Sequence, residues 1–145
     1  GPRPGQGELP LYTREQYLEL AIDNELLYQE ALRRGYGPSE AEVLEFARAT
    51  KDSLLAAMKE DSEGAKILRE VFRQVEGTDY HVDAYDSSPV MLEAFRQQLA
   101  TNELRVEIIS ALPESDRNDL AKREEAVAAF VSTLRASADI NIVVP

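Results

Sequence analysis

The segment AIDNELLYQEALRRGYGPSEAEV, residues 21–43, decides how this chain is expected to fold. Its first part has a helical pattern and carries apolar side chains around more than half of the helix circumference. Because an ordinary surface helix has a single apolar stripe, this helix is expected to have neighbours on several sides. The segment breaks at Gly35–Pro38, where proline prevents simple continuation, and a second helical pattern begins at Ser39.

Capping boxes mark the starts of the first two helices. Thr13 with Gln16, and Ser39 with Glu42, have the spacing in which a hydroxyl accepts from a backbone N–H and the longer side chain bonds back. Gly35 is expected to end the first helix in the left-handed conformation. These signals predict helices over residues 14–34 and 40–59.

The first helix is predicted to be the centre of the fold. Only a strip through Glu19, Asp23, Glu30 and Arg34 is expected to face water. The remaining arc is apolar and comprises Tyr17, Leu18, Leu20, Ala21, Ile22, Leu26, Leu27, Tyr28, Ala31 and Leu32.

Three further helices are expected over residues 65–75, 89–112 and 116–137, with residues 78–88 forming a loop or one helical turn. Only residues 113–115 are expected to separate the last two helices. Helical periodicity selects the side chains that these helices and the second helix should bury. They are Val43, Phe46, Ala47, Leu54, Leu55, Met58, Leu68, Val71, Phe72, Val75, Leu92, Phe95, Leu99, Val106, Ile109, Leu120, Val127, Phe130, Val131 and Leu134.

The C-terminal residues change to the alternating pattern of a strand, in which Ile140, Ile142 and Val144 share one face. An isolated strand is not stable, so residues 139–144 are expected to pair with residues 9–12, or with a second copy in a strand-swapped homodimer. The predicted fold is therefore one all-α domain of about five helices around a central N-terminal helix, with a short C-terminal β-strand near the N-terminus. Residues 1–7 are interpreted as a flexible start or a cleavage scar.

Composition excludes several classes of function. The chain of 145 residues is 43% hydrophobic, so it can form a packed core. A formal charge of −11 disfavours nucleic acid and anionic membrane surfaces as partners and favours solubility. With no cysteine there is no disulfide or thiolate metal site, and no apolar run approaches the roughly 20 residues of a membrane span. Whether a targeting or anchoring segment precedes the sequence is left open.

No known catalytic motif is found. The sequence lacks a glycine-rich phosphate loop, a His-Glu-x-x-His motif and a Gly-x-Ser-x-Gly elbow. His81 is the single histidine and lies among Asp79, Asp83 and Asp86, so a metal site there is the alternative to a solvated loop. The spacing does not match an EF-hand, and the solvated loop is favoured. We therefore predict no catalytic residues, no cofactor and no metal, and we rank an enzyme that uses this acidic loop last.

Two segments resemble a known family. The stretch YTREQYLELAIDNELLYQEALRRGYGPSEAEV, residues 12–43, is similar to the N-terminal chaperone module of the SurA/PrsA-type parvulin chaperones. KREEAVAAFVSTLRASADINIVVP, residues 122–145, resembles the C-terminal helix and strand of that module. The matching residues are Thr13, Arg14, Tyr17, Ile22, Leu26, Leu27, Glu30, Ala31, Gly35, Ser39, Glu42, Val43, Ala138, Asp139 and Ile140.

The sequence departs from the family in two places. Relatives with an isomerase carry the parvulin domain between the N-terminal helices and the C-terminal helix, and residues 113–115 leave no room for it here. The family's first strand is missing or truncated at Gln6–Gly7. The resemblance therefore implies an extracytoplasmic chaperone, periplasmic or at the cell surface, that binds unfolded or extended polypeptides without ATP and without prolyl isomerase activity.

Side chains that repack easily suit a surface that must accept many sequences. On this basis the candidate peptide-binding residues are Tyr36, Met58, Tyr80, Tyr85 and Met91, and the alternative is that the methionines fill the core while the tyrosines are half-exposed. A second function hypothesis is a helical assembly domain that binds one specific protein partner or self-associates.

Overall fold

The computed structural model describes residues 12–138. Over this range the chain forms five α-helices and two single-turn 3₁₀ helices and no strand, which confirms the all-α class there. The elements are α1 Arg14–Arg33, α2 Glu40–Met58, α3 Glu63–Gln74, η1 Val82–Ala84, α4 Pro89–Ser110, η2 Glu114–Asp116 and α5 Leu120–Ser137. The predicted strand over residues 139–144, nearly all of its expected partner at 9–12, and residues 1–7 lie outside the described residues.

Side-chain caps set where the helices begin. The predicted capping boxes at Thr13 and Ser39 are both present. Helix α3 begins two residues earlier than predicted because the Ser62 hydroxyl accepts from the backbone N–H of Ala65. Helix α5 begins four residues later than predicted because Asp119 is its cap. The connection between α4 and α5 therefore spans residues 111–119, longer than the predicted 113–115.

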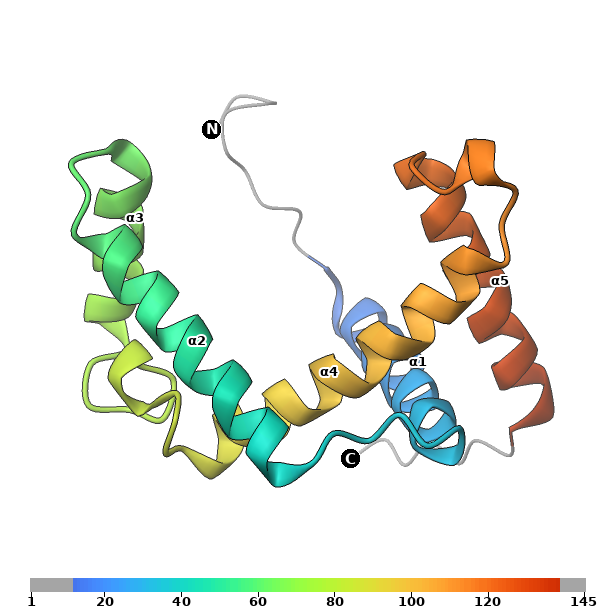
Figure 1. The fold of residues 1–145 in the computed structure, drawn as a ribbon, viewed down its shortest axis with the longest axis horizontal. Coiled ribbons are helices and arrows are strands. Elements are labelled where there is room, and N and C mark those ends of the chain that lie inside the picture. The colour runs from blue at the N-terminus through green and yellow to red at the C-terminus, as the bar shows by residue number, and fades with distance from the viewer. Residues whose placement is uncertain (1–11, 139–145) are drawn as a thin grey trace.

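The hub of the fold is α4, and the prediction of a central N-terminal helix is wrong. Within residues 12–138, α4 packs extensively against three helices, α1, α2 and α5. Helix α1 packs extensively against only two, α4 and α5. Figure 1 shows the reason: the connection after Gly35 carries the chain away from α1 to the other end of α4, where α2 begins. Helices α2 and α3 therefore cannot cover α1.

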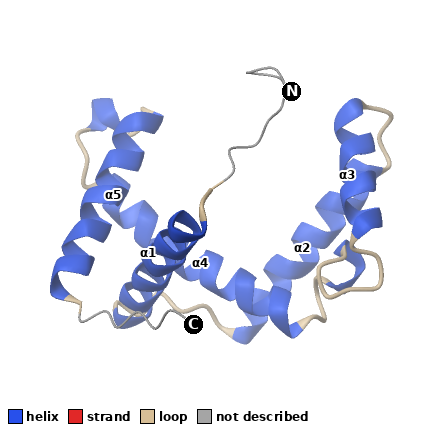
Figure 2. Ribbon diagram, turned by 180° about the vertical axis from the view of Figure 1, so that it is seen from behind, coloured by secondary structure: helices blue, strands red, loops and turns tan. Residues whose placement is uncertain are grey.

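Two separate clusters of buried side chains form the core, and α4 contributes to both. The first cluster joins α1, α4 and α5 and comprises Leu27, Tyr28, Ala31, Ala100, Leu104, Val127 and Val131. The second joins α2 to the N-terminal part of α4 and comprises Val43, Ala47 and Phe95. Viewed from behind, α2 with α3 and α1 with α5 form two arms that diverge from α4 (Figure 2).

Several side chains that periodicity predicts to be buried are exposed. Tyr17 is 57% exposed, Leu20 43%, Val106 61% and Leu120 70%, and Leu32 and Val71 are also exposed. Conversely, Leu104 was not among the predicted inward residues and is fully buried. Periodicity identifies an apolar face correctly, but burial also needs a neighbouring element along the whole length of that face. None of the helices among residues 12–138 has the length and apolar content that crossing a membrane requires.

Candidate functional site

An open groove runs along the arm that α1 and α5 form with α4. Its larger part lies between α1, α4 and α5, has a volume of about 540 Å³, and contains Leu20, Leu27, Val127 and Val131 among its apolar lining. A second hollow of about 440 Å³ continues over α4 and α5 and shares Arg105, Glu124 and Val127 with the first. Together we call these hollows the α1–α4–α5 groove. Its size falls within the range of known ligand pockets.

The groove is lined by apolar side chains that no part of residues 12–138 covers. Val106 and Leu120 line the second hollow, and Leu20 lines the first. On α1, Leu20 follows Tyr17 and Leu18, which are exposed as well. Single exposed apolar residues are ordinary, whereas a group of them around a concave surface is typical of an interaction site. These residues are therefore the candidate site.

Arg135 fixes the wall of the groove formed by α1 and α5. Its guanidinium donates to the Asp23 carboxylate at 2.7 Å and to the Glu19 backbone carbonyl at 3.1 Å, and it forms an ion pair with the Glu19 carboxylate at 2.6 Å. The hydrogen bond to Asp23 raises the pKa of Arg135, with Glu19 adding to the effect. Since α1 and α5 are far apart in sequence, this bridge sets their relative position without filling the groove.

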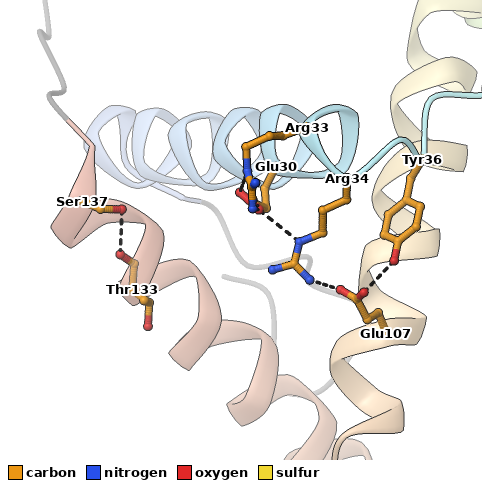
Figure 3. A network of polar contacts seen from close by, with 7 residues as sticks. All are labelled: Glu30, Arg33, Arg34, Tyr36, Glu107, Thr133 and Ser137. Carbon is orange, nitrogen blue, oxygen red and sulfur yellow. Dashed lines mark hydrogen bonds and ion pairs between the residues drawn. The ribbon is translucent and has the colours of Figure 1, made fainter.

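A polar network holds α1, the following loop and α4 together on the other side of this arm (Figure 3). Arg34 donates to Glu30 at 3.0 Å and pairs with Glu107, which also accepts a hydrogen bond of 2.6 Å from the Tyr36 hydroxyl. The Arg34 guanidinium lies 5.2 Å from the centre of the Phe130 ring of α5. The network therefore joins all three helices that form the groove.

The same network lowers the pKa of its carboxylates. Hydrogen bonding to Arg33, assisted by Arg34, lowers the pKa of Glu30 to about 2. The hydrogen bond from Tyr36 lowers the pKa of Glu107, and in turn raises that of the Tyr36 phenol. Both carboxylates are thus held ionised.

Tyr85 and Met91, two of the predicted peptide-binding residues, each pack against the second core cluster. The Tyr85 ring meets Phe95 edge-on at 5.5 Å and Phe72 at 5.9 Å between centroids. Burial raises the pKa of the Tyr85 phenol. The structure therefore gives these two residues a packing role, as in the alternative considered from the sequence.

The other three predicted residues lie in separate places. Tyr36 is half-buried and belongs to the network with Glu107. Met58 is half-buried at the end of α2, where its carbonyl accepts from Arg69 at 2.6 Å, and Tyr80 is 57% exposed in the loop after α3. The five predicted residues therefore do not form one surface.

Sequence reasoning missed the groove residues because it assigned them to the core. The signal was the breadth of the apolar arc on the first helix, which exceeds what two neighbouring helices can cover. Leu20, Val106 and Leu120 were all identified as apolar positions of the correct helices. The prediction that neighbouring helices bury these three side chains was wrong.

The acidic loop around His81 is held by local contacts. His81 Nδ1 accepts from the backbone N–H of Asp83 at 3.1 Å, and the ring meets Phe72 edge-on at 5.9 Å. Asp86 forms an ion pair of 3.2 Å with Lys51 of α2. Within the described range, no three acidic or histidine side chains are arranged to hold a metal ion.

Comparison with family models, curated proteins and solved structures finds no match to this chain. The resemblance to the SurA/PrsA-type chaperones stays a prediction from the motifs of residues 12–43 and 122–145.

Proposed function

We propose that this protein binds unfolded or extended polypeptides in the α1–α4–α5 groove and thereby keeps them from aggregating, without ATP. The observation that carries the proposal is that Leu20, Val106 and Leu120, all largely exposed, line one open groove. The resemblance to the chaperone module of the SurA/PrsA-type family points to the same function. Burying a client's apolar side chains against these three residues is the source of affinity.

The open shape of the groove suits weak and sequence-tolerant binding. An open apolar surface without a deep side-chain pocket discriminates little between one apolar side chain and another. Release then follows from low affinity, on the order of micromolar or about −8 kcal/mol, and requires no driven cycle. The charge of −11 helps to keep a complex with an apolar client soluble.

The proposed activity is binding without prolyl isomerisation. In isomerase-containing relatives the parvulin domain is inserted before the C-terminal helix, and at that place residues 111–119 form a short connection with one 3₁₀ turn. We further propose, from the resemblance alone, that the protein acts outside the cytoplasm, in the periplasm or at the cell surface.

Light scattering by an aggregating client tests the proposal. The protein in several-fold molar excess should slow aggregation of a chemically unfolded client in the absence of nucleotide. The double variant Val106→Ser/Leu120→Ser should lose most of this effect while its circular dichroism and thermal unfolding stay nearly unchanged, because both side chains are exposed. Unchanged scattering with the wild-type protein would contradict the chaperone proposal.

Ile67 provides the matched control. It is 62% exposed, apolar and helical like Val106, but it lies on α3 and not in the groove. Ile67→Ser should suppress aggregation as well as the wild type does. Equal loss with Ile67→Ser and with the groove variants would show that general surface hydrophobicity, and not the groove, is responsible.

A helical assembly domain is the second candidate function. It is favoured by the exposed start of α1, where the rings of Tyr12 and Tyr17 meet edge-on at 5.6 Å and form an exposed aromatic pair. In this proposal residues 139–144 form a strand that pairs with residues 9–12 of the same chain or of a second copy. Light scattering coupled to size exclusion, at several concentrations, distinguishes a dimer from a monomer.

A further inference from the structure

The charges in the groove are not evenly distributed. The second hollow is lined by Arg105, Arg123 and Asn102 with one acidic residue, Glu124. At the opposite end Arg135 lies between two carboxylates, Asp23 and Glu19. In a chain with 27 acidic and 16 basic residues, the second hollow is thus a locally positive part of an acidic protein.

The two arginines of this hollow are available to a ligand. Neither Arg105 nor Arg123 forms an ion pair or a side-chain hydrogen bond with any residue in the range 12–138, although Glu124 lines the same hollow. By contrast, Arg34, Arg96 and Arg135 each bind carboxylates of neighbouring helices. Val106 and Leu120, the two most exposed apolar side chains of the groove, lie in the same hollow as these arginines.

We propose that the Val106–Leu120 end of the groove binds apolar peptide segments that carry a carboxylate, which pairs with Arg105 and Arg123. This inference rests on the proposed peptide-binding function and specifies its substrate class. A planar guanidinium binds a carboxylate through two parallel hydrogen bonds, and apolar neighbours strengthen the pairing by excluding water. The acidic far end of the groove would repel the same carboxylate, so the charges also give the bound segment a direction.

The size of the preference follows from the exposure of the two arginines to water, since Arg123 is exposed and Arg105 is half-buried in an open hollow. Solvent-exposed ion pairs are weak, so each arginine should change the affinity by about two- to fivefold. The preference should decrease as salt is raised toward 0.5 M, because exposed charges are screened. The apolar part of the binding should persist at high salt.

Fluorescence anisotropy with labelled, unstructured peptides tests the inference. Three peptides of alternating Leu and Ser with an amidated C-terminus differ only in a central Glu, Gln or Lys. The Glu peptide should bind tightest and the Lys peptide weakest. A fourth peptide, with central Gln and a free C-terminal carboxylate, tells whether the hollow takes a terminal carboxylate, a side-chain carboxylate or both.

Arg48 supplies the control variant. It is exposed on α2, lines neither hollow, and forms no ion pair within the described residues. Arg105→Gln and Arg123→Gln should each reduce the advantage of the Glu peptide over the Gln peptide, whereas Arg48→Gln, which changes the net charge equally, should leave it intact. Circular dichroism of each variant checks that the fold is preserved.

The outcomes separate this inference from the proposed function. If the Glu, Gln and Lys peptides bind equally and Val106→Ser/Leu120→Ser still weakens them, the carboxylate preference is wrong and the peptide-binding function stands. If Arg48→Gln weakens binding of the Glu peptide as much as Arg105→Gln does, the assignment to this hollow is overturned. If none of the peptides binds, both proposals fail.

Discussion

The hydroxyl of Tyr36 donates a hydrogen bond of 2.6 Å to the Glu107 carboxylate and so joins the connection after α1 to the last turn of α4 (Figure 3). Arg34 pairs with the same carboxylate. The Glu107 carboxylate therefore holds the end of α1 and the start of the connection to α2 against α4. The first prediction concerns this contact.

Tyr36→Phe should lower the thermal midpoint by a small amount, because it removes the hydroxyl and leaves the ring packed against the first core cluster. Because the hydrogen bond raises the Tyr36 pKa above its usual 10, its contribution is present below pH 10 and is lost as the pH rises past that value. The stability difference between wild type and Tyr36→Phe should therefore shrink at alkaline pH. Thermal unfolding at pH 7 and above pH 10 measures this, and a constant difference would contradict the assignment.

Glu30→Gln should destabilise the fold by about 1 kcal/mol at neutral pH, because it removes the carboxylate shared by Arg33 and Arg34. Folding lowers the pKa of Glu30 from 4.5 to about 2, so its contribution is present above pH 4.5 and is lost as the pH falls toward 2. Urea unfolding at pH 7 and at pH 2 should show the difference between wild type and variant disappearing at the lower pH.

Glu70 is the control for this effect. Its pKa is also lowered to about 2, by hydrogen bonds from Arg73 and then Gln74, but all three residues lie on exposed turns of α3. Glu70→Gln should therefore have a smaller effect that disappears with added salt. If Glu30→Gln and Glu70→Gln destabilise the protein equally, the ion pair that joins Arg34 to α4 contributes nothing to stability.

Gly35→Ala and Gly64→Ala should have opposite effects on stability. Gly35 has a φ of +84°, so alanine there should cost about 1 kcal/mol even though its Cβ would meet no atom. Gly64 lies in the first turn of α3, where an added Cβ would make only an ordinary van der Waals contact of 3.9 Å with Ser62 Oγ, and alanine should stabilise the fold by about 0.5 kcal/mol. Chemical denaturation of both variants checks the signs, and destabilisation by Gly64→Ala would contradict the described start of α3.

Tyr85→Ser should destabilise the protein by about 2–4 kcal/mol, because the ring packs between Phe72 and Phe95. Tyr80→Ser, in the same loop but 57% exposed, should change stability by less than about 0.5 kcal/mol. The sequence alone assigned both tyrosines to peptide binding. A small effect of Tyr85→Ser on the denaturation midpoint would restore that interpretation.

The chain should not accelerate prolyl isomerisation. The reason is that only the short connection at residues 111–119 stands between α4 and α5, which leaves no room there for an inserted isomerase domain. A protease-coupled assay on a proline peptide should give the uncatalysed rate. Clear acceleration would contradict both this prediction and the purely binding function proposed above.

The sequence by itself determined where α1, α2 and α4 begin. Thr13 and Ser39 are capping residues by their sequence spacing, and each accepts the expected backbone N–H; the fourth helix begins at Pro89 as predicted, with the Ser88 hydroxyl as its cap. Capping depends on side chains only a few residues apart, so the information is local. The all-α class and the buried positions Leu27, Phe95 and Val127 follow from the same local periodicity.

Only the tertiary structure decided which helix is central and which apolar residues stay exposed. Leu104 and Val106 lie two residues apart on α4, yet the first is fully buried and the second is 61% exposed. Periodicity selects Val106 and not Leu104 as an inward residue, but only Leu104 faces the cluster that α4 forms with α1 and α5. The candidate groove was therefore hidden in the sequence, since an apolar residue without a neighbour has the same local pattern as one that is buried.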